Sequence, residues 1–147
     1  MPTFPKIAQA PGFELQPLTK LHGHADVQLV VTGGYRTPDE MAKAMALGAD
    51  AVALATASMM AIGCQQYRAC HRGTCPVGIA TQNPVLRSRL DPAVSAERLT
   101  RFLLAATEMM TDYARITGRR SLGELAREDL AALRPDVAAL LDIDVRA

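Results

Sequence analysis

Two short stretches dominated by apolar residues, 27–31 and 51–55, flank a segment with a different periodicity. Apolar runs of this length are typical of strands that are buried on both faces of a sheet. Between them, apolar side chains recur at the three- and four-residue spacing of a helix, at Met41, Ala44, Met45 and Leu47. Strand, turn, helix and strand in this order predict one parallel, right-handed βαβ unit.

The residues around this helix mark its two ends. Thr37 is suited to the N-cap, Pro38 to the first helical position, and Glu40 completes a capping box. Gly48 is a natural residue for the left-handed position after a helix. After the second strand, residues 57–62 predict a short apolar helix.

The rest of the chain is expected to be a loop followed by helices. Residues 64–84 are rich in Gln, Arg, Gly, Thr and Pro without periodicity, which predicts an ordered loop around a ligand. A long helix is expected to begin at Ser95 and to end at Gly118. Its apolar stripe would consist of Leu99, Phe102, Leu103, Ala106, Met109, Met110 and Tyr113. After a capping box at 121–124, two short helices are expected near 128–133 and 136–141.

These elements divide the chain into four segments. Residues 1–26 contain four prolines and form a poorly defined N-terminal segment. Residues 27–63 hold the strand–helix–strand unit, 64–84 the cysteine loop, and 85–147 a helical tail. We therefore expect an α/β fold.

Composition and charge exclude several classes. The 147 residues are 49% hydrophobic and 21% charged, which excludes bulk disorder. A net charge of +1 gives no electrostatic case for binding nucleic acid or an anionic membrane. The longest uncharged stretch, 51–67, contains polar residues and does not indicate a membrane span. The N-terminus has no secretory pattern, so we expect a cytoplasmic protein.

The three cysteines carry the strongest chemical signal. Their spacing is Cys64-x5-Cys70-x4-Cys75, with Pro76 directly after the last. An odd number of closely spaced thiols without an export signal indicates metal chemistry rather than disulfides. Thiolates select iron or zinc, and three of them on one loop match a cluster with three iron corners.

Other interpretations of these residues stay open. With His71 the cysteines could form a structural Cys3His zinc site, or they could be inert buried thiols. His22 and His24 form either a metal pair or part of a solvated loop. No Ser–His–Asp arrangement or suitable carboxylate pair is present, so no catalytic residue is assigned.

A glycine turn provides a second candidate site. Gly33 and Gly34 follow the first strand and precede the helix, which exposes backbone N–H groups where a phosphate can bind. Arg36 could pair with that phosphate. The second strand leads into Ala55, Thr56 and Ala57, another source of N–H groups. In (β/α)8 barrels the last two strands often build a phosphate site, although a plain tight turn explains the glycines equally well.

Residues 30–87, VVTGGYRTPDEMAKAMALGADAVALATASMMAIGCQQYRACHRGTCPVGIATQNPVLR, combine these features. This segment resembles the C-terminal end of the FMN-binding domain of glutamate synthases, and the resemblance continues more loosely into the tail. It implies the last two strands of a TIM-type (β/α)8 barrel, incomplete in this chain. It also implies a [3Fe-4S] cluster on Cys64, Cys70 and Cys75, and an FMN phosphate held by Gly33, Gly34, Arg36, Ala55, Thr56 and Ala57.

The resemblance also implies an activity and partners. Electrons from an NAD(P)H-dependent flavoprotein subunit or from ferredoxin would pass through the cluster to FMN. The product would be glutamate, formed reductively from 2-oxoglutarate and ammonia that a glutamine amidotransferase domain or subunit releases. Another chain or domain would supply the rest of the barrel. The alternatives are an electron-transfer module without catalysis of its own and a truncated, inactive product.

Overall fold

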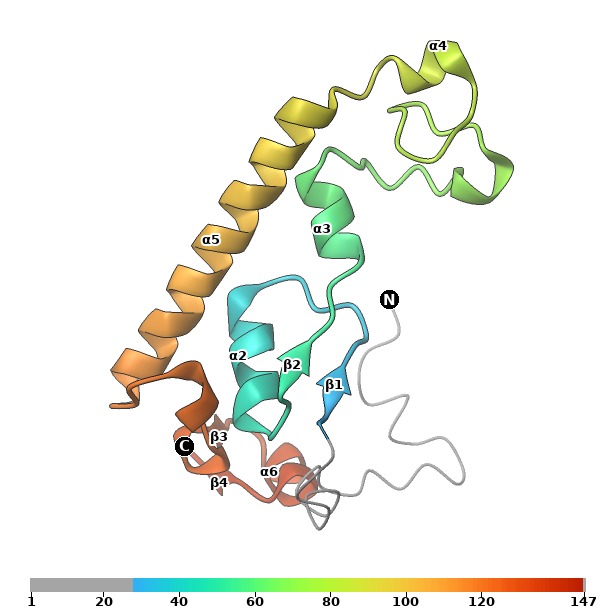
Figure 1. Cartoon of the computed structure of the whole chain (residues 1–147). Coiled ribbons are helices and arrows are strands. Elements are labelled where there is room, and N and C mark those ends of the chain that lie inside the picture. Colours follow the sequence, from blue (N-terminus) through green and yellow to red (C-terminus); the bar gives the residue numbers. More distant parts are fainter. Residues whose placement is uncertain (1–27, 147) are drawn as a thin grey trace.

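The computed structural model describes residues 28–146. The expected segment 1–26, with His22 and His24, and the start of the first expected strand at Val27 lie outside the described residues. The elements in chain order are β1 (Val30–Val31), α2 (Pro38–Ala46), β2 (Ala51–Val52), α3 (Thr56–Ala61), η2 (Cys70–Arg72), α4 (Pro84–Arg87), α5 (Pro92–Ile116), η3 (Leu122–Glu124), η4 (Arg127–Asp129), β3 (Ala131–Ala132), α6 (Pro135–Leu141) and β4 (Asp144–Val145) (Figure 1).

The predicted strand–helix–strand unit is confirmed. β1 and β2 pair in parallel, with Val30 opposite Ala51 and Val31 opposite Val52. Asp50 holds the start of this pair: its Oδ2 accepts the Leu29 N–H at 2.6 Å, and its own N–H donates to the Leu29 carbonyl at 2.9 Å. The chain crosses between the strands through α2, which lies between the sheet and α5 (Figure 1).

The predicted ends of α2 are confirmed as well. Thr37 is the N-cap and Pro38 the first helical residue. The Glu40 carboxylate accepts the backbone N–H groups of Arg36 at 2.7 Å and Thr37 at 3.2 Å. Gly48 adopts a φ of 103°, so the chain leaves the helix in a Schellman turn.

The strands are shorter than expected and are covered on one face only. The structure assigns two residues to each strand rather than 27–31 and 51–55. Exposure alternates along them: Val30 is 61% exposed and Ala51 is exposed, whereas Val31 and Val52 are half-buried. No described element covers the Val30 face, so burial on both faces is not reached within this chain. An open face is what we expect of strands that another chain or domain completes.

The long helix starts earlier than predicted. α5 begins at Pro92, because the Asp91 side chain accepts the N–H groups of Ala93 and Val94 as an N-cap. Most of the expected stripe faces the interior: Ala106 is buried, and Leu99, Phe102, Met110 and Tyr113 are half-buried. Leu103 and Met109 are the exceptions, at 43% and 48% exposed. The other buried residues of the helix are small as well, Ser95 and Ala114.

The tail differs from the expected pair of helices. Only the second, α6, forms; residues 127–129 make one 3-10 turn, and Ala131–Ala132 form β3, which pairs in parallel with β4. Pro135 explains part of the difference, because it disfavours a helical conformation in the residue before it. Arg134 is accordingly extended, as the N-cap of α6.

The interior of the described part is built mainly from alanine. Small side chains let α2, α3 and α5 approach closely, and no large side chain of the described residues is fully buried. The buried apolar residues are Met41, Ala42, Ala44, Ala46, Ala49, Ala57, Ala69, Cys75, Ala106, Ala114, Ala132 and Ala138. Among the described helices, none is long and apolar enough to cross a membrane.

The ion pair between Arg119 and Asp129 supports a pH-dependent prediction. Arg119 Nε donates to both Asp129 carboxylate oxygens, at 3.1 and 2.9 Å, and the Ala126 N–H donates to Oδ2 at 2.9 Å. The Arg119 guanidinium, mainly, holds the pKa of Asp129 below its usual value. The stabilisation is therefore complete above the unfolded-state pKa of about 3.9, and it is lost as the pH falls through the folded-state pKa.

We expect Asp129→Asn to lower the free energy of unfolding at pH 7 by about 1–2 kcal/mol, because Arg119 is 34% exposed and solvent screens the pair. The difference from the wild type should shrink below about pH 4. Urea denaturation across this pH range measures it. Asp136→Asn is the control, because Asp136 forms an exposed ion pair with Arg134. This variant should change the free energy of unfolding little. A difference that stays constant with pH would contradict the prediction.

Candidate functional site

The two expected phosphate-binding segments meet at one edge of the β1–β2 sheet. Since the strands are parallel, the turn after β1 and the start of α3 after β2 both lie at their carboxyl ends. This edge is where parallel α/β folds generally place their ligand sites. The structure therefore brings Gly33 and Gly34 to the same side of the sheet as residues 55–57.

The glycine turn is open and uses conformations that favour glycine. Gly33 has a φ of 141° and Gly34 a φ of 91°, and no atom lies within 4 Å of the place where either would carry a Cβ. The next N–H groups, of Arg36 and Thr37, already donate to Glu40. These bonds lower the pKa of Glu40. A phosphate at this turn would therefore depend on the glycine N–H groups and on the exposed Arg36 side chain.

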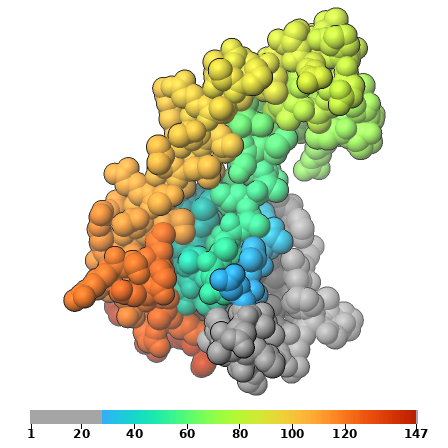
Figure 2. All heavy atoms as spheres, in the orientation of Figure 1, coloured from blue at the N-terminus to red at the C-terminus, as the bar shows by residue number. Residues whose placement is uncertain are grey.

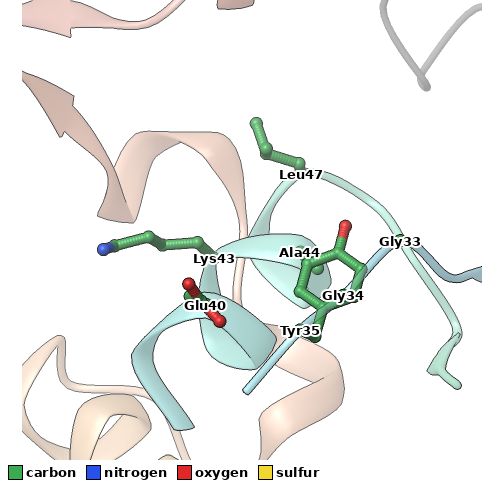
Figure 3. Close-up of a pocket in the computed structure, with 7 residues that line it drawn as sticks. All are labelled: Gly33, Gly34, Tyr35, Glu40, Lys43, Ala44 and Leu47. Carbon is green, nitrogen blue, oxygen red and sulfur yellow. The ribbon is translucent and has the colours of Figure 1, made fainter. Parts of the chain in front are cut away.

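A shallow pocket of ≈ 290 Å³ lies beside this turn, between it and α2 (Figure 3). The Tyr35 ring forms one wall; its pKa is raised by burial and, secondarily, by the charge of Glu40. Lys43 points away from the ring and pairs with Asp39 at 2.8 Å. Arg36 does not line the pocket. Gly33 and Gly34 also line the pocket, and Lys43, the one cation that lines it among the described residues, is paired with Asp39.

Residues 55–57 form the start of α3. Ala55 is the N-cap without a side-chain hydrogen bond, Thr56 is half-buried, and Ala57 is 5% exposed. The first N–H groups of a helix lack partners within the helix. This segment therefore offers N–H donors and one hydroxyl at the sheet edge.

The same short helix sets the position of the first cysteine. α3 ends at Ala61, and Gly63 follows with a φ of 106°. The Cys64 N–H donates to the Met59 carbonyl at 2.9 Å, which closes a Schellman turn. The Gln66 N–H lies 3.4 Å from Cys64 Sγ and donates to it. The backbone of Cys64 is thus fixed at the end of α3.

The other two cysteines differ in environment. Cys70 opens η2 and is exposed, whereas Cys75 is only 6% exposed. The pKa of the Cys75 thiol is lowered: the Ala80 N–H contributes most, the N–H groups of residues 77–79 add to it, and burial opposes the shift. Such N–H donors stabilise a thiolate, which is the form that binds metals.

The described side chains do not form a single-ion metal site. Among residues 28–146, no three His, Cys, Asp or Glu side chains are positioned to hold one metal ion. A Cys3His set including His71 is therefore not assembled in this conformation. In a cluster each iron takes its own thiolate, so the ligands stand further apart than around one ion. The assignment of Cys64, Cys70 and Cys75 to a cluster stays a prediction.

We call residues 64–90, from Cys64 to the segment after α4, the cysteine lobe. It projects beyond α3, away from the β1–β2 sheet (Figures 1 and 2). Its two halves are held together by an antiparallel bridge between Thr74 and Thr81 and by Arg89, which donates to the Pro76 carbonyl at 3.0 Å. A Cβ on Gly78 would lie 2.6 Å from the Leu86 carbonyl oxygen, so the turn after Cys75 packs tightly against α4.

Sequence reasoning found the cysteines and the glycines, and the glycines of the loop indicated close wrapping of the sulfurs by backbone N–H groups. Residues 77–80 provide such N–H groups around Cys75. The occupation of the Arg36 N–H by Glu40 was implicit in the capping box. Gln66 and Arg68 also adopt positive φ angles of 57° and 56°. These two conformations could not be predicted, because neither residue is a glycine.

Comparison with known proteins identifies the family to which this chain belongs. Residues 12–120 match the family described as the conserved region in glutamate synthase, which covers both the glycine turn and the cysteine lobe. The chain belongs to this glutamate synthase family. It is an α/β segment of that family, as the strand–helix–strand unit indicates.

Individual relatives support the same family assignment. A glutamate synthase large subunit-like protein of Rhizobium meliloti is 40% identical over 97% of this chain and 35% of its own length. An archaeal glutamate synthase [NADPH] of Methanocaldococcus jannaschii is 40% identical over 68% of the chain and 20% of its own length. A protein of the same description from Archaeoglobus fulgidus is 46% identical over 52% of the chain and 15% of its own. The chain thus spans about a third or less of these relatives.

The contact at Gly78 yields a matched pair of variants. We expect Gly78→Ala to destabilise the lobe by about 2–4 kcal/mol, because the methyl group would overlap backbone atoms and φ is 82°. Gly73→Ala, with φ at 66° but open space around it, should cost only about 1–2 kcal/mol. Amide hydrogen exchange of residues 70–90 measures both. Equal losses of protection would show that the close packing at Gly78 is not the cause.

Proposed function

We propose that this chain supplies the FMN-phosphate end and the [3Fe-4S] loop of a glutamate synthase-type oxidoreductase. One observation carries the proposal: α3 alone joins the phosphate-binding edge to the cysteine lobe. Its six residues begin after a three-residue connection from β2, and two residues separate their end from Cys64. Six helical residues rise about 9 Å. A flavin at the edge and a cluster in the lobe would therefore be close neighbours.

The donor set of the lobe supports a cluster. Cys64, Cys70 and Cys75 are free thiols on one folded loop, and no cysteine lies elsewhere in the chain. The Gln66 N–H donates to Cys64 Sγ, and the backbone N–H groups of residues 77–80 lower the pKa of the Cys75 thiol. Such bonds stabilise thiolate ligands and tune the reduction potential of a bound cluster. In this proposal each of the three thiolates binds one iron corner.

The phosphate of FMN would bind at the carboxyl edge of β1 and β2. Gly33 and Gly34 have open space where a side chain would stand, and the exposed Arg36 adds a cation two residues after Gly34. Ala55, Thr56 and Ala57 would contribute N–H groups and one hydroxyl from the second strand end. Since Glu40 occupies the Arg36 N–H, the arginine would act through its guanidinium.

The open sheet face supports the idea that β1 and β2 are the last two strands of a (β/α)8 barrel. Val30 and Ala51 lie exposed on one face, and two short strands are marginal without further cover. In a barrel this face would point inward and pack against the other strands. Those strands would come from another domain or chain. The segments 27–63, 64–84 and 85–147 would then be barrel end, cluster loop and tail.

The bound cofactors would supply electron transfer and the reduction that forms glutamate from 2-oxoglutarate and glutamine-derived ammonia. The names of two relatives specify NADPH, which suggests a nicotinamide-dependent flavoprotein subunit as donor; ferredoxin is the alternative. An amidotransferase domain or subunit would provide the ammonia. The residues of this chain would hold the cofactors and contribute no acid–base group.

A second candidate function is electron transfer without catalysis. The internal contacts of the cysteine lobe favour it, because the Thr74–Thr81 bridge, the Arg89 bond and the Gly78 contact need no barrel. Such a module would bind the cluster but no flavin. Measuring both iron and flavin in the purified protein therefore distinguishes this function from the first.

Iron and acid-labile sulfide, measured on protein purified without oxygen, test the cluster. We expect about three irons and four sulfides per chain. Cys64→Ser, Cys70→Ser and Cys75→Ser should each lose most of the iron together with the visible absorbance. His71→Ala is the control and should keep both. Zinc without sulfide, or loss of the metal in His71→Ala, would refute the cluster.

Flavin preference tests the phosphate site. With the chain that completes the barrel present, FMN should bind more tightly than riboflavin, which lacks the phosphate. Arg36→Gln should reduce this preference about tenfold, the effect of losing one charge-assisted bond. Arg120→Gln is the matched control, because Arg120 is an exposed arginine of the tail and the substitution removes the same charge. Fluorescence titration measures both flavins, and an unchanged preference in Arg36→Gln would exclude that residue from the site.

A further inference from the structure

The charged residues of α5 all lie on one side of this helix. Successive residues of a helix are rotated by about 100°, which places the six charges within an arc of about 100°. The rest of the circumference is uncharged, and only part of it packs against α2, α3 and η3. An uncharged sector is therefore left over beside the packed face. The charged residues are Glu97, Arg98, Arg101, Glu108, Asp112 and Arg115.

The leftover sector carries a regular stripe of uncharged residues at Thr100, Leu104, Thr107 and Thr111. Their spacing of four, three and four residues keeps them on one side of the helix and is the spacing of a coiled-coil seam. Leu104 is 67% exposed, and the neighbouring Leu103 is 43% exposed. Within residues 28–146, no element covers the middle of this stripe.

The threonines of the stripe do not oppose contact with an apolar surface. Thr100, Thr107 and Thr111 each donate the side-chain hydroxyl to the backbone carbonyl four residues earlier, at 2.9, 2.8 and 2.8 Å. These hydroxyls therefore already have hydrogen-bond partners within the helix. Covering the stripe with a second helix would leave none of them unsatisfied, so it would not incur that cost.

The charges beside the stripe alternate in sign. Glu97, Arg101, Glu108 and Arg115 follow one another along this edge of the helix. Glu97 pairs with Arg101, and Arg115 pairs with Asp112 at 2.9 Å. Because each of these side chains is more than half exposed, the pairs are weak and can rearrange. In the reverse direction the signs run positive, negative, positive, negative, so the edge is complementary to its own antiparallel copy.

Two copies of α5 can pair along the stripe in an antiparallel arrangement. When the two-fold axis passes level with Ala105, Leu104 lies opposite Thr107 of the second copy, and Thr100 lies opposite Thr111 of the second copy. Each contact occurs twice, because a two-fold interface uses the same surface of both copies. The exposed leucine would then lie at the centre of the interface.

The same register matches the charges. Arg101 comes beside Glu108 of the second copy, and Glu97 lies within one helical turn of Arg115 of the second copy. A parallel pair in register would instead bring each charge near its own like, which is unfavourable. The stripe and the charges are separate features of the sequence, and both favour the same antiparallel register.

We infer that the outer face of α5 is an interface with a second copy of this chain, formed by antiparallel pairing of the two helices. α5 lies at the outer edge of the described structure, with α2 and α3 on its other side (Figures 1 and 2). Its 25 residues extend about 37 Å. The cysteine lobe precedes α5 in the chain, so the two lobes would lie at opposite ends of the interface. The inference does not depend on the proposed cofactors.

Sedimentation velocity of the full chain over a range of concentrations tests the interface. We expect reversible dimers that dissociate in the micromolar range, as is usual for small interfaces. Leu104→Glu should raise the dissociation constant about tenfold or more, because it places a carboxylate at the centre of the seam in both copies. Ala105→Glu is the matched control: it adds the same charge on the exposed, charged side of α5 and should change the constant less than about twofold. Circular dichroism checks that both variants fold.

An exchange of charges tests the register. Arg101→Glu should weaken the dimer about fivefold, because a carboxylate then meets Glu108 of the other copy at two symmetric places. Adding Glu108→Arg to this variant should restore the dissociation constant to within about twofold, since both pairs form again with reversed signs. If the second substitution does not rescue the dimer, the antiparallel register is wrong.

Three further results would overturn the inference. One is a chain that stays monomeric up to about 100 μM. Another is loss of the dimer in Val30→Glu but not in Leu104→Glu, which would assign self-association to the open face of the β1–β2 sheet. The third is loss, in Leu104→Glu, of binding to the chain that completes the barrel while self-association persists, because that chain and not a second copy would then cover α5.

Discussion

One backbone constraint directs the chain after each of three helices: a glycine with positive φ directly after the C-cap. Gly48, Gly63 and Gly118 have φ angles of 103°, 106° and 79°. In each case the next residue returns its N–H to a carbonyl of the last helical turn, from Ala49 to Ala44, from Cys64 to Met59, and from Arg119 to Ala114. A side chain at such a position is strained, so the turn depends on glycine. β2, the cysteine lobe and the Arg119–Asp129 pair all start from these fixed points.

Much of the fold could be predicted because its signals are local. Thr37 before Pro38 marked the start of α2, and Gly48 marked its end. The same signature stands at Asn83–Pro84 and Asp91–Pro92, where both side chains cap their helices, and it would have placed α4 and the start of α5 correctly. The open face of β1 was predictable from the count of strands, because two strands with helices on one side leave the other face uncovered. The β3–β4 pair was missed because two alanines carry no strand signal of their own.

Some features of the candidate site could likewise be predicted from the sequence, and others could not. Spacing alone identified the three cysteines, and the glycine turn followed from its position after a strand. The environments that distinguish Cys70 from Cys75 depend on how the lobe folds over itself, through Gly78 and the Thr74–Thr81 bridge. The competition between Glu40 and a phosphate for the N–H groups of Arg36 and Thr37, by contrast, is implicit in the capping box that the sequence predicts.

The exposed face of the β1–β2 sheet has a thermodynamic consequence. A surface that covered Val30 and Ala51 would bind the folded chain and not the unfolded one, because the face exists only when the strands are paired. Folding and association are then linked by mass action, and the apparent stability rises with the concentration of the covering surface. If that surface belongs to the same polypeptide, its effective concentration is fixed by the linker between them. The melting temperature of this segment would then depend on its surroundings as much as on its own sequence.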